Sequence, residues 1–227
     1  MAWPEAVIFD LDGTLIDTAP AIACALNRVI VTRGGQEVTV DSVRKLVSRG
    51  APELVATALG HCVISPEQDL RDFRSAYGAL DPNHQDLYPG TMETLQFLNE
   101  KGIRLGLCTN KPQSLTNALL NKLDLIPLFA AVIGGDMVHH AKPHPGHLLA
   151  VLSALEVTPN DVIFVGDSEV DAQTAQGAEV TFVLAGYGYA SGPPELIPCW
   201  KQISGLNEIP ALLPIGPPNL SKTRCPI

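Results

Sequence analysis

Asp10 and Asp12 are the residues whose types and spacing most directly indicate chemistry. They follow the apolar run Val7-Ile8-Phe9, and Gly13 comes directly after them. In such a pair, Asp10 can attack phosphorus and form an acyl phosphate, while Asp12 gives a proton to the leaving group and later takes one from water. Because two close carboxylates repel each other and an anionic substrate, we expect a hard cation beside them, most simply Mg²⁺. The other interpretation is a plain turn, since Asp and Gly favour turns.

Two later apolar runs also end in side chains that suit phosphate. The run 103–108 leads directly to Thr109 and Asn110, whose hydroxyl and amide can donate hydrogen bonds to phosphate oxygens. The run 130–133 leads to a loop that carries Lys142, whose ammonium offers a positive charge to a phosphoryl group. Phosphate-handling groups therefore recur after separate runs.

A further run, 162–165, leads to Asp167 and Asp171. Strands buried on both faces of a parallel sheet read as unbroken apolar runs, and the active sites of such sheets lie just beyond the carboxyl ends of the strands. We therefore expect the side chains that follow these runs to meet at one edge of a sheet. Chance turns are a poor explanation for this ordered series.

The series resembles the motifs of the haloacid-dehalogenase-like hydrolase superfamily, and the resemblance covers the chain from about residue 5 to about residue 190. The matching segments are Asp10-Leu11-Asp12-Gly13-Thr14-Leu15, Thr109-Asn110-Lys111, Lys142-Pro143, and Gly166-Asp167-Ser168 with Asp171. The resemblance implies that Thr109 and Asn110 hold phosphoryl oxygens and that Lys142 neutralises charge on the nucleophile and the transferring group. It also implies a Mg²⁺ site, to which it assigns Asp10, Asp12 (also through its backbone carbonyl), Asp167 and Asp171.

The elements that must position these residues follow from the spacing of apolar side chains. That spacing is helical in four segments after the first run, at 21–31, 43–46, 54–59 and 70–77. From Tyr88 onward, helix and strand patterns alternate, with a fifth strand expected at about 180–184, which predicts crossover units and a parallel sheet.

The predicted fold class is therefore α/β, a doubly wound parallel sheet with a Rossmann-like core. The helical segments look like the small cap that one branch of the superfamily inserts after the first strand. We expect a discontinuous core hydrolase domain at residues 1–17 and 87–227, and a helical cap domain at residues 18–86.

The loop at 47–53 resembles the phosphoglycolate-phosphatase-like subfamily, although Ser48 stands where that loop more usually has Gly. Pro52 predicts a helix start, so the amides of Gly50 and Ala51 are expected to meet an anion there. We expect Arg49 to pair with a carboxylate of the substrate, unless it is an exposed surface side chain. The expected activity is Mg²⁺-dependent hydrolysis of a small phosphate monoester, best represented by 2-phosphoglycolate.

Composition limits the partners. The 227 residues carry a formal net charge of -9 and no basic patch is visible, which argues against nucleic acid and anionic membranes. No apolar run reaches the roughly 18 residues of a membrane span. The five cysteines have no paired spacing, which indicates free thiols in a reducing, cytoplasmic compartment. A monomer or a homodimer is expected.

Three further features receive no catalytic role. The four histidines at positions 139, 140, 144 and 147 fit no standard zinc spacing and are expected to be loop histidines. A last helix is expected at 205–213, and the Pro- and Gly-rich tail after Pro214 is expected on the surface or disordered.

Two other functions stay open at this point. Sugar-phosphate mutases of the same superfamily keep both aspartates and a similar cap. From another class, the chain could be a non-catalytic protein that binds phosphate or another protein.

Overall fold

A six-stranded sheet forms the centre of the computed structural model, which describes residues 4–214 and, at Arg49, the backbone only. The strand order is β3-β2-β1-β4-β5-β6, and every pair of neighbours is parallel. The order changes direction beside β1, which is the doubly wound arrangement, so the predicted α/β fold class is confirmed. The strands are β1 (Ala6–Phe9), β2 (Arg104–Thr109), β3 (Ala131–Gly134), β4 (Val162–Gly166), β5 (Thr181–Ala185) and β6 (Lys201–Ile203).

Helices cover both faces of the sheet because successive strand residues point to opposite sides. In β1, Val7 and Phe9 pack into the apolar cluster on one face, and Ala6 and Ile8 pack into the cluster on the other. The first cluster is completed by α5 (Thr91–Glu100), α6 (Gln113–Lys122) and α9 (Ile209–Leu212), and the second by α7 (Pro145–Leu155) and α8 (Glu169–Gly177).

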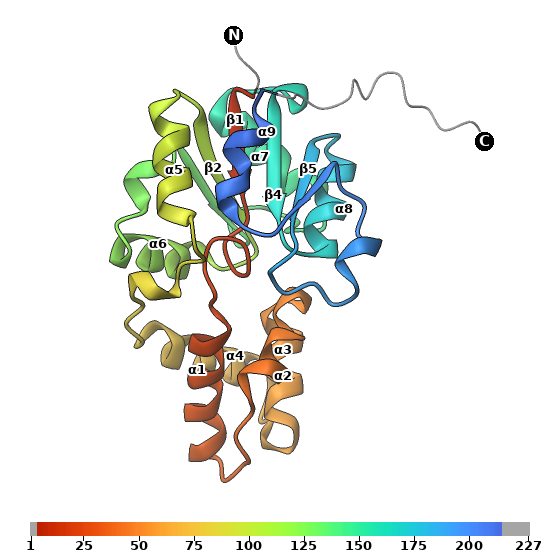
Figure 1. Cartoon of the computed structure of the whole chain (residues 1–227). Coiled ribbons are helices and arrows are strands. Elements are labelled where there is room, and N and C mark those ends of the chain that lie inside the picture. Colours follow the sequence, from red (N-terminus) through yellow and green to blue (C-terminus); the bar gives the residue numbers. More distant parts are fainter. Residues whose placement is uncertain (1–3, 215–227) are drawn as a thin grey trace, which may run out of the picture.

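Four helices lie between β1 and α5 in the sequence, where helical spacing predicted them. They are α1 (Ala19–Thr32), α2 (Val40–Arg44), α3 (Ala51–Leu59) and α4 (Pro66–Gly78). They pack around an apolar cluster of their own that includes Leu26, Leu54 and Phe73, and they lie together below the sheet (Figure 1). We call these four helices the helical insertion. The division of the chain into two domains at residues 18 and 86 stays a prediction.

Local capping explains where two of these helices begin. The side chain of Thr39 accepts a hydrogen bond from the amide of Ser42, so α2 starts earlier than the apolar spacing indicated. Ser65 caps α4 in the same way through the amide of Gln68, and Pro66 occupies the first helical turn.

Two elements near the carboxyl end differ from the sequence analysis. Strand β6 was not predicted, because it has only three residues, two of them exposed, and so shows no apolar run. The segment expected as one helix at 205–213 is a 3-10 turn, Leu206–Glu208, followed by α9. Pro210 lies in the first turn of α9, where it has no N–H to continue a helix from the preceding turn.

Within the described residues, no helix has both the length and the hydropathy of a membrane span. Four cysteines are free thiols: Cys24, Cys62, Cys108 and Cys199. Cys225 and the tail from residue 215 lie outside the described residues.

Candidate active site

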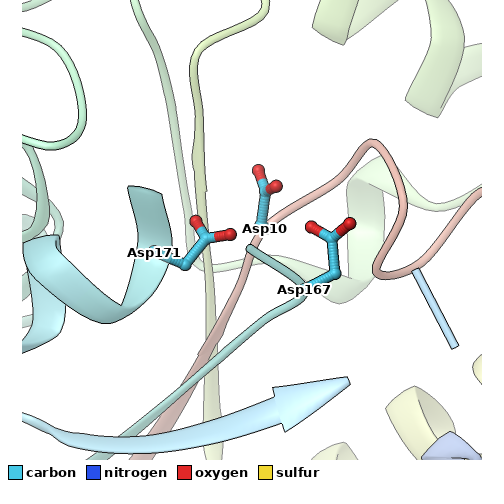
Figure 2. Close-up of side chains that lie close together, drawn as sticks. All are labelled: Asp10, Asp167 and Asp171. Atoms are coloured by element: carbon cyan, nitrogen blue, oxygen red, sulfur yellow. The ribbon is translucent and has the colours of Figure 1, made fainter. Parts of the chain in front are cut away.

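Three carboxylates from different segments converge at the carboxyl edge of the sheet. Asp10 follows β1, Asp167 follows the neighbouring strand β4, and Asp171 lies in the first turn of α8. All three are buried, and each offers an oxygen within 4.8 Å of the others (Figure 2). Pairing of Phe9 with Val165 brings β1 and β4 to the same height, so the residues that follow the two strands meet.

Helix capping holds Asp171 in this group. Ser168 is the N-cap of α8, and its hydroxyl accepts a hydrogen bond from the amide of Asp171 at 3.4 Å. In return, the Asp171 carboxylate accepts hydrogen bonds from the hydroxyl and the amide of Ser168, at 2.7 Å and 3.2 Å. This capping box places one carboxylate oxygen toward its own helix and leaves the other for the cluster.

Lys142 supplies the positive charge of the cluster. Its Nζ lies 2.8 Å from Oδ1 of Asp10 and 2.6 Å from Oδ1 of Asp171. Burial alone would lower the pKa of Lys142, but attraction by the two carboxylates outweighs it, and the pKa lies above its usual value. Lys142 is therefore a permanently charged contact of the expected nucleophile.

The pKa values of the carboxylates show that the single positive charge of Lys142 does not balance their negative charges. Burial, together with repulsion from Asp171, raises the pKa of Asp10 to about 7, although Lys142 lowers it. Burial and the charges of Asp171 and Asp10 raise the pKa of Asp167 well above its usual range. A site that keeps protons on buried carboxylates at neutral pH is short of positive charge.

A divalent cation fits this donor set. The ligands on offer are hard carboxylate oxygens from Asp10, Asp167 and Asp171, with no sulfur or imidazole among the three residues. Mg²⁺ prefers such oxygens and would replace the protons with two positive charges. Among the described residues, this is the only group of three or more His, Cys, Asp or Glu side chains with metal-binding spacing.

Asp12 lies elsewhere in the pocket. Its carboxylate binds Lys111 Nζ at 2.9 Å and 3.2 Å and is not part of the cluster of three. The lysine attracts it away from the other carboxylates, which repel it. The structure therefore gives no support for the Asp12 side chain as a metal ligand; the role of its backbone carbonyl, and its role as acid and base, stay predictions.

The turn after β1 wraps around Asp167. Gly13 has a φ of +88°, and a Cβ there would lie 2.3 Å from Oδ2 of Asp167, so only glycine fits. The hydroxyl of Thr14 donates to Oδ1 of Asp167 at 3.4 Å. The backbone amide of Tyr189 donates to Oδ2 of the same carboxylate. Asp167 is thus held by two loops that are far apart in the sequence.

Thr109 and Asn110 lie at the tip of β2, beside the cluster. The Thr109 hydroxyl is buried and accepts a hydrogen bond from the amide of Lys111, and the Asn110 side chain donates to the carbonyl of Lys142 at 2.9 Å. Both residues line the same open pocket of about 420 Å³ as the cluster, which we call the phosphoryl pocket. Its described lining is Asp10, Asp12, Val47, Ser48, Gly50, Thr109, Asn110, Lys111, Lys142, Asp167, Ser168, Val170 and Tyr189.

The residues predicted in the loop before α3 lie at the pocket in part. Gly50 lines the phosphoryl pocket, and Ala51 lines an adjoining pocket. The Ser48 hydroxyl lies 2.9 Å from that of Ser191, which joins the helical insertion to the loop after β5. Arg49 belongs to the 3-10 turn Val47–Arg49, and its side chain lies outside the described part. The predicted contacts of Arg49, Gly50 and Ala51 with an anion stay predictions.

Two residues of this region had no predicted function. Lys111 belongs to the matching segment Thr109-Asn110-Lys111 but was given no role, and Tyr189 was not assigned to the site. The position of Lys111 directly after Thr109 and Asn110 was a usable signal, since it follows a strand tip. For Tyr189 there was no comparable signal, because an aromatic residue after a strand usually packs at the rim of a core.

Comparison with known proteins adds independent information. Residues 7–185 match a family model described as "Haloacid dehalogenase-like hydrolase". The chain is 37% identical over 220 residues to a phosphoglycolate phosphatase of Pseudomonas putida, covering 93% of this chain and 79% of that protein. It is 36% identical over 212 residues to a phosphoglycolate phosphatase of Cereibacter sphaeroides, covering 91% and 96% of the two chains.

A solved structure has the same architecture. It is described as that of a predicted phosphoglycolate phosphatase from Haemophilus somnus, and it superposes with a TM-score of 0.85 at 27% identity. The similarity covers 92% of this chain and 97% of the other, so it extends over both the sheet and the helical insertion.

Proposed function

The chain belongs to the haloacid dehalogenase-like hydrolase family, and from this we propose that it is a Mg²⁺-dependent phosphatase of small phosphate monoesters. The expected substrate is 2-phosphoglycolate, because relatives 36 to 37% identical over most of the chain are named phosphoglycolate phosphatases. The observation that carries the proposal is the meeting of Asp10, Asp167, Asp171 and Lys142 in one cluster. A phosphate dianion needs positive charge and an ionised nucleophile, which Lys142, a divalent cation held by the carboxylates, and Asp10 would supply.

In the first step, a carboxylate oxygen of Asp10 attacks phosphorus, and the bond from phosphorus to the ester oxygen breaks. Asp12 gives its proton to that oxygen, so the alcohol leaves neutral and an aspartyl phosphate remains on Asp10. Lys142 holds Asp10 in place and carries positive charge next to the transferring group. A bound Mg²⁺ would offset the negative charge of the carboxylates and of the phosphoryl oxygens.

In the second step, Asp12 takes a proton from water as the water oxygen attacks phosphorus. The bond between phosphorus and Asp10 breaks, and inorganic phosphate leaves with Asp10 as a free carboxylate again. Thr109 and Asn110, which line the phosphoryl pocket at the tip of β2, would contact phosphoryl oxygens in both steps. Proton and electron pairs balance over the cycle, since water supplies the hydroxyl of phosphate and the proton returned to Asp12.

The test is phosphate release from 2-phosphoglycolate, with and without Mg²⁺, by the wild type and by Asp10→Asn. An amide cannot form the acyl phosphate, so we expect the variant to lose at least about a thousandfold in kcat. Circular dichroism and a thermal melt establish that the variant is folded. Substantial residual turnover by a folded Asp10→Asn protein would remove the covalent mechanism.

The same assay separates the other functions considered. Net conversion of a hexose 1-phosphate to its isomer, in the presence of a sugar bisphosphate, would indicate a mutase instead. Failure to release phosphate from 2-phosphoglycolate, from other small esters and from 4-nitrophenyl phosphate would favour a non-catalytic binding protein.

We place the protein in the cytoplasm, because its free thiols fit a reducing compartment.

A further inference from the structure

Lys111 joins the core to the helical insertion. Its side chain is only 7% exposed, and its Nζ binds both carboxylate oxygens of Asp12 at 2.9 Å and 3.2 Å. The same Nζ lies 4.5 Å from the centre of the Tyr77 ring, which comes from α4 of the insertion. Attraction to Asp12 and Tyr77 outweighs the effect of burial and raises the pKa of Lys111, so the ammonium stays charged. The roles proposed above do not use this buried cation.

Lys111 lies where two pockets meet. It lines the phosphoryl pocket and also the adjoining pocket of about 580 Å³, and Asp12 lines both with it. The adjoining pocket lies between the insertion and α6, and most of its wall is apolar, with Leu54, Phe73 and Leu115 among its residues. The group attached to the ester oxygen of a substrate with its phosphorus at Asp10 can therefore extend past Lys111 into the adjoining pocket.

The charges of the adjoining pocket favour a small anionic group at this border. Among its described lining side chains, the cations are Lys111 and Arg74, and the anion is Asp12. Arg74 is exposed, whereas Lys111 is buried, so a carboxylate at Lys111 would form its hydrogen bond away from water. The Lys111 ammonium has three N–H donors; it donates to both carboxylate oxygens of Asp12 and also interacts with the Tyr77 hydroxyl.

We propose that Lys111 is a specificity-determining residue that binds a carboxylate on the carbon next to the phosphate ester. The inference rests on the proposed phosphatase function and adds the residue that recognises the carboxylate of the leaving group. Binding exchanges part of the contact between Lys111 and Asp12 for a contact between Lys111 and the substrate. The centre of the Tyr77 ring lies 4.5 Å from the ammonium, on the side of the insertion.

The experiment compares two esters that differ only in this group. They are 2-phosphoglycolate and 2-hydroxyethyl phosphate, in which a hydroxymethyl group replaces the carboxylate. We expect the wild type to favour 2-phosphoglycolate in kcat/KM. We expect Lys111→Met to lose about 10- to 100-fold more on 2-phosphoglycolate than on 2-hydroxyethyl phosphate, mainly through KM. Lys111→Arg, which keeps the charge, should restore most of the preference.

Three results would overturn the proposal. One is a wild type that hydrolyses both esters with equal kcat/KM, a result that needs no variant to fold. Another is an equal loss on both esters in Lys111→Met, which would mean that Lys111 only holds Asp12. The last is a larger selective loss in Arg74→Met or in Arg49→Met, which would assign the carboxylate to that arginine.

A third substrate keeps this test separate from that of the proposed function. The leaving group of 4-nitrophenyl phosphate departs without a proton and carries no carboxylate, so it reports on the phosphoryl pocket alone. Phosphate release from it by the wild type, with no preference between the two alkyl esters, would overturn the role of Lys111 and leave the phosphatase standing. No release from any of the three esters would remove the phosphatase itself.

Discussion

At the scale of single residues, the carboxylates of the site have few positively charged partners. Lys142 contacts Asp10 and Asp171 within 2.8 Å, and its side chain is 3% exposed. A buried ion pair of this kind need not add net stability, because removing two charges from water is costly. Removing the lysine alone does destabilise the fold, because the carboxylates stay buried but lose their positively charged partner.

Lys142→Met is therefore expected to lower the free energy of unfolding by about 3 kcal/mol at pH 8 without divalent cations. The loss should be smaller at pH 5, because Asp10, with a pKa of about 7, is then protonated and needs no counter-charge. Urea denaturation at the two pH values measures this difference. We also expect phosphatase activity to fall about a hundredfold, as charge next to the transferring group is lost.

Lys201→Met is the matched control, because Lys201 is exposed on β6. It should change the free energy of unfolding by less than about 0.5 kcal/mol at either pH. Equal effects of the two substitutions would contradict the assigned role of Lys142.

At the scale of elements, the turn after β1 sets the position of Asp167. It brings the backbone of Gly13 so close to that carboxylate that a Cβ would lie 2.3 Å from Oδ2 and 2.7 Å from the Tyr189 ring. Two features therefore constrain the turn: the positive φ of Gly13, and the Asp167 carboxylate and Tyr189 ring that lie against it.

Gly13→Ala and Gly102→Ala separate these two constraints. Gly102 also has a positive φ, +74°, but a Cβ there would have nothing within 4 Å. We expect Gly102→Ala to cost about 1 kcal/mol from backbone strain, and Gly13→Ala about 3 kcal/mol because crowding is added. Thermal or urea unfolding measures the costs, and isothermal titration with Mg²⁺ should show weaker binding for Gly13→Ala alone. Similar losses in both variants, with unchanged Mg²⁺ affinity, would show that Asp167 tolerates the contact.

At the scale of the whole molecule, charge couples metal binding to stability. The chain has a formal net charge of -9. At the site, the carboxylates of Asp10, Asp12, Asp167 and Asp171 are paired with only the ammonium groups of Lys111 and Lys142 among the described side chains. Fully ionised, this set has a surplus of two negative charges, which one divalent cation would neutralise.

The free energy of unfolding without divalent cations should therefore fall as pH rises from about 4 to about 7. The folded state holds a proton on Asp10 up to a pKa of about 7, while the unfolded state releases it near the usual pKa of 3.8, so higher pH favours unfolding. The raised pKa of Asp167 acts in the same direction.

Mg²⁺ should counteract this loss, because it binds the ionised carboxylates of the folded state. We expect Mg²⁺ to raise Tm by several degrees at pH 7.5 and by much less at pH 5, when both are compared with EDTA. Differential scanning calorimetry at the two pH values measures the difference. A Tm that Mg²⁺ shifts equally at both values would argue against these carboxylates as its site.

Much of the fold and part of the site followed from local sequence. The apolar runs predicted five of the six strands, and helical spacing predicted the four helices of the helical insertion. The polar residues after those runs indicated where Asp10, Thr109, Lys142 and Asp167 would meet. These signals are readable because strand and helix patterns extend over a few neighbouring residues, and parallel strands end at a common edge. Strand β6 was not predicted, because three residues are too few to show the alternation or the apolar run of a strand.

Only the tertiary structure decided which charges pair. Asp12 and Lys111 are 99 positions apart, and they meet because the register of β1 and β2 sets Phe9 opposite Leu107. The structure likewise decided that Asp171 both caps α8 and faces Asp10, and that Tyr77 of the insertion covers Lys111. Ion pairs and ring contacts depend on distances of a few ångströms between segments that are distant in the chain. Residue types and their spacing along the sequence do not show those distances, because the packing of the sheet and helices sets them.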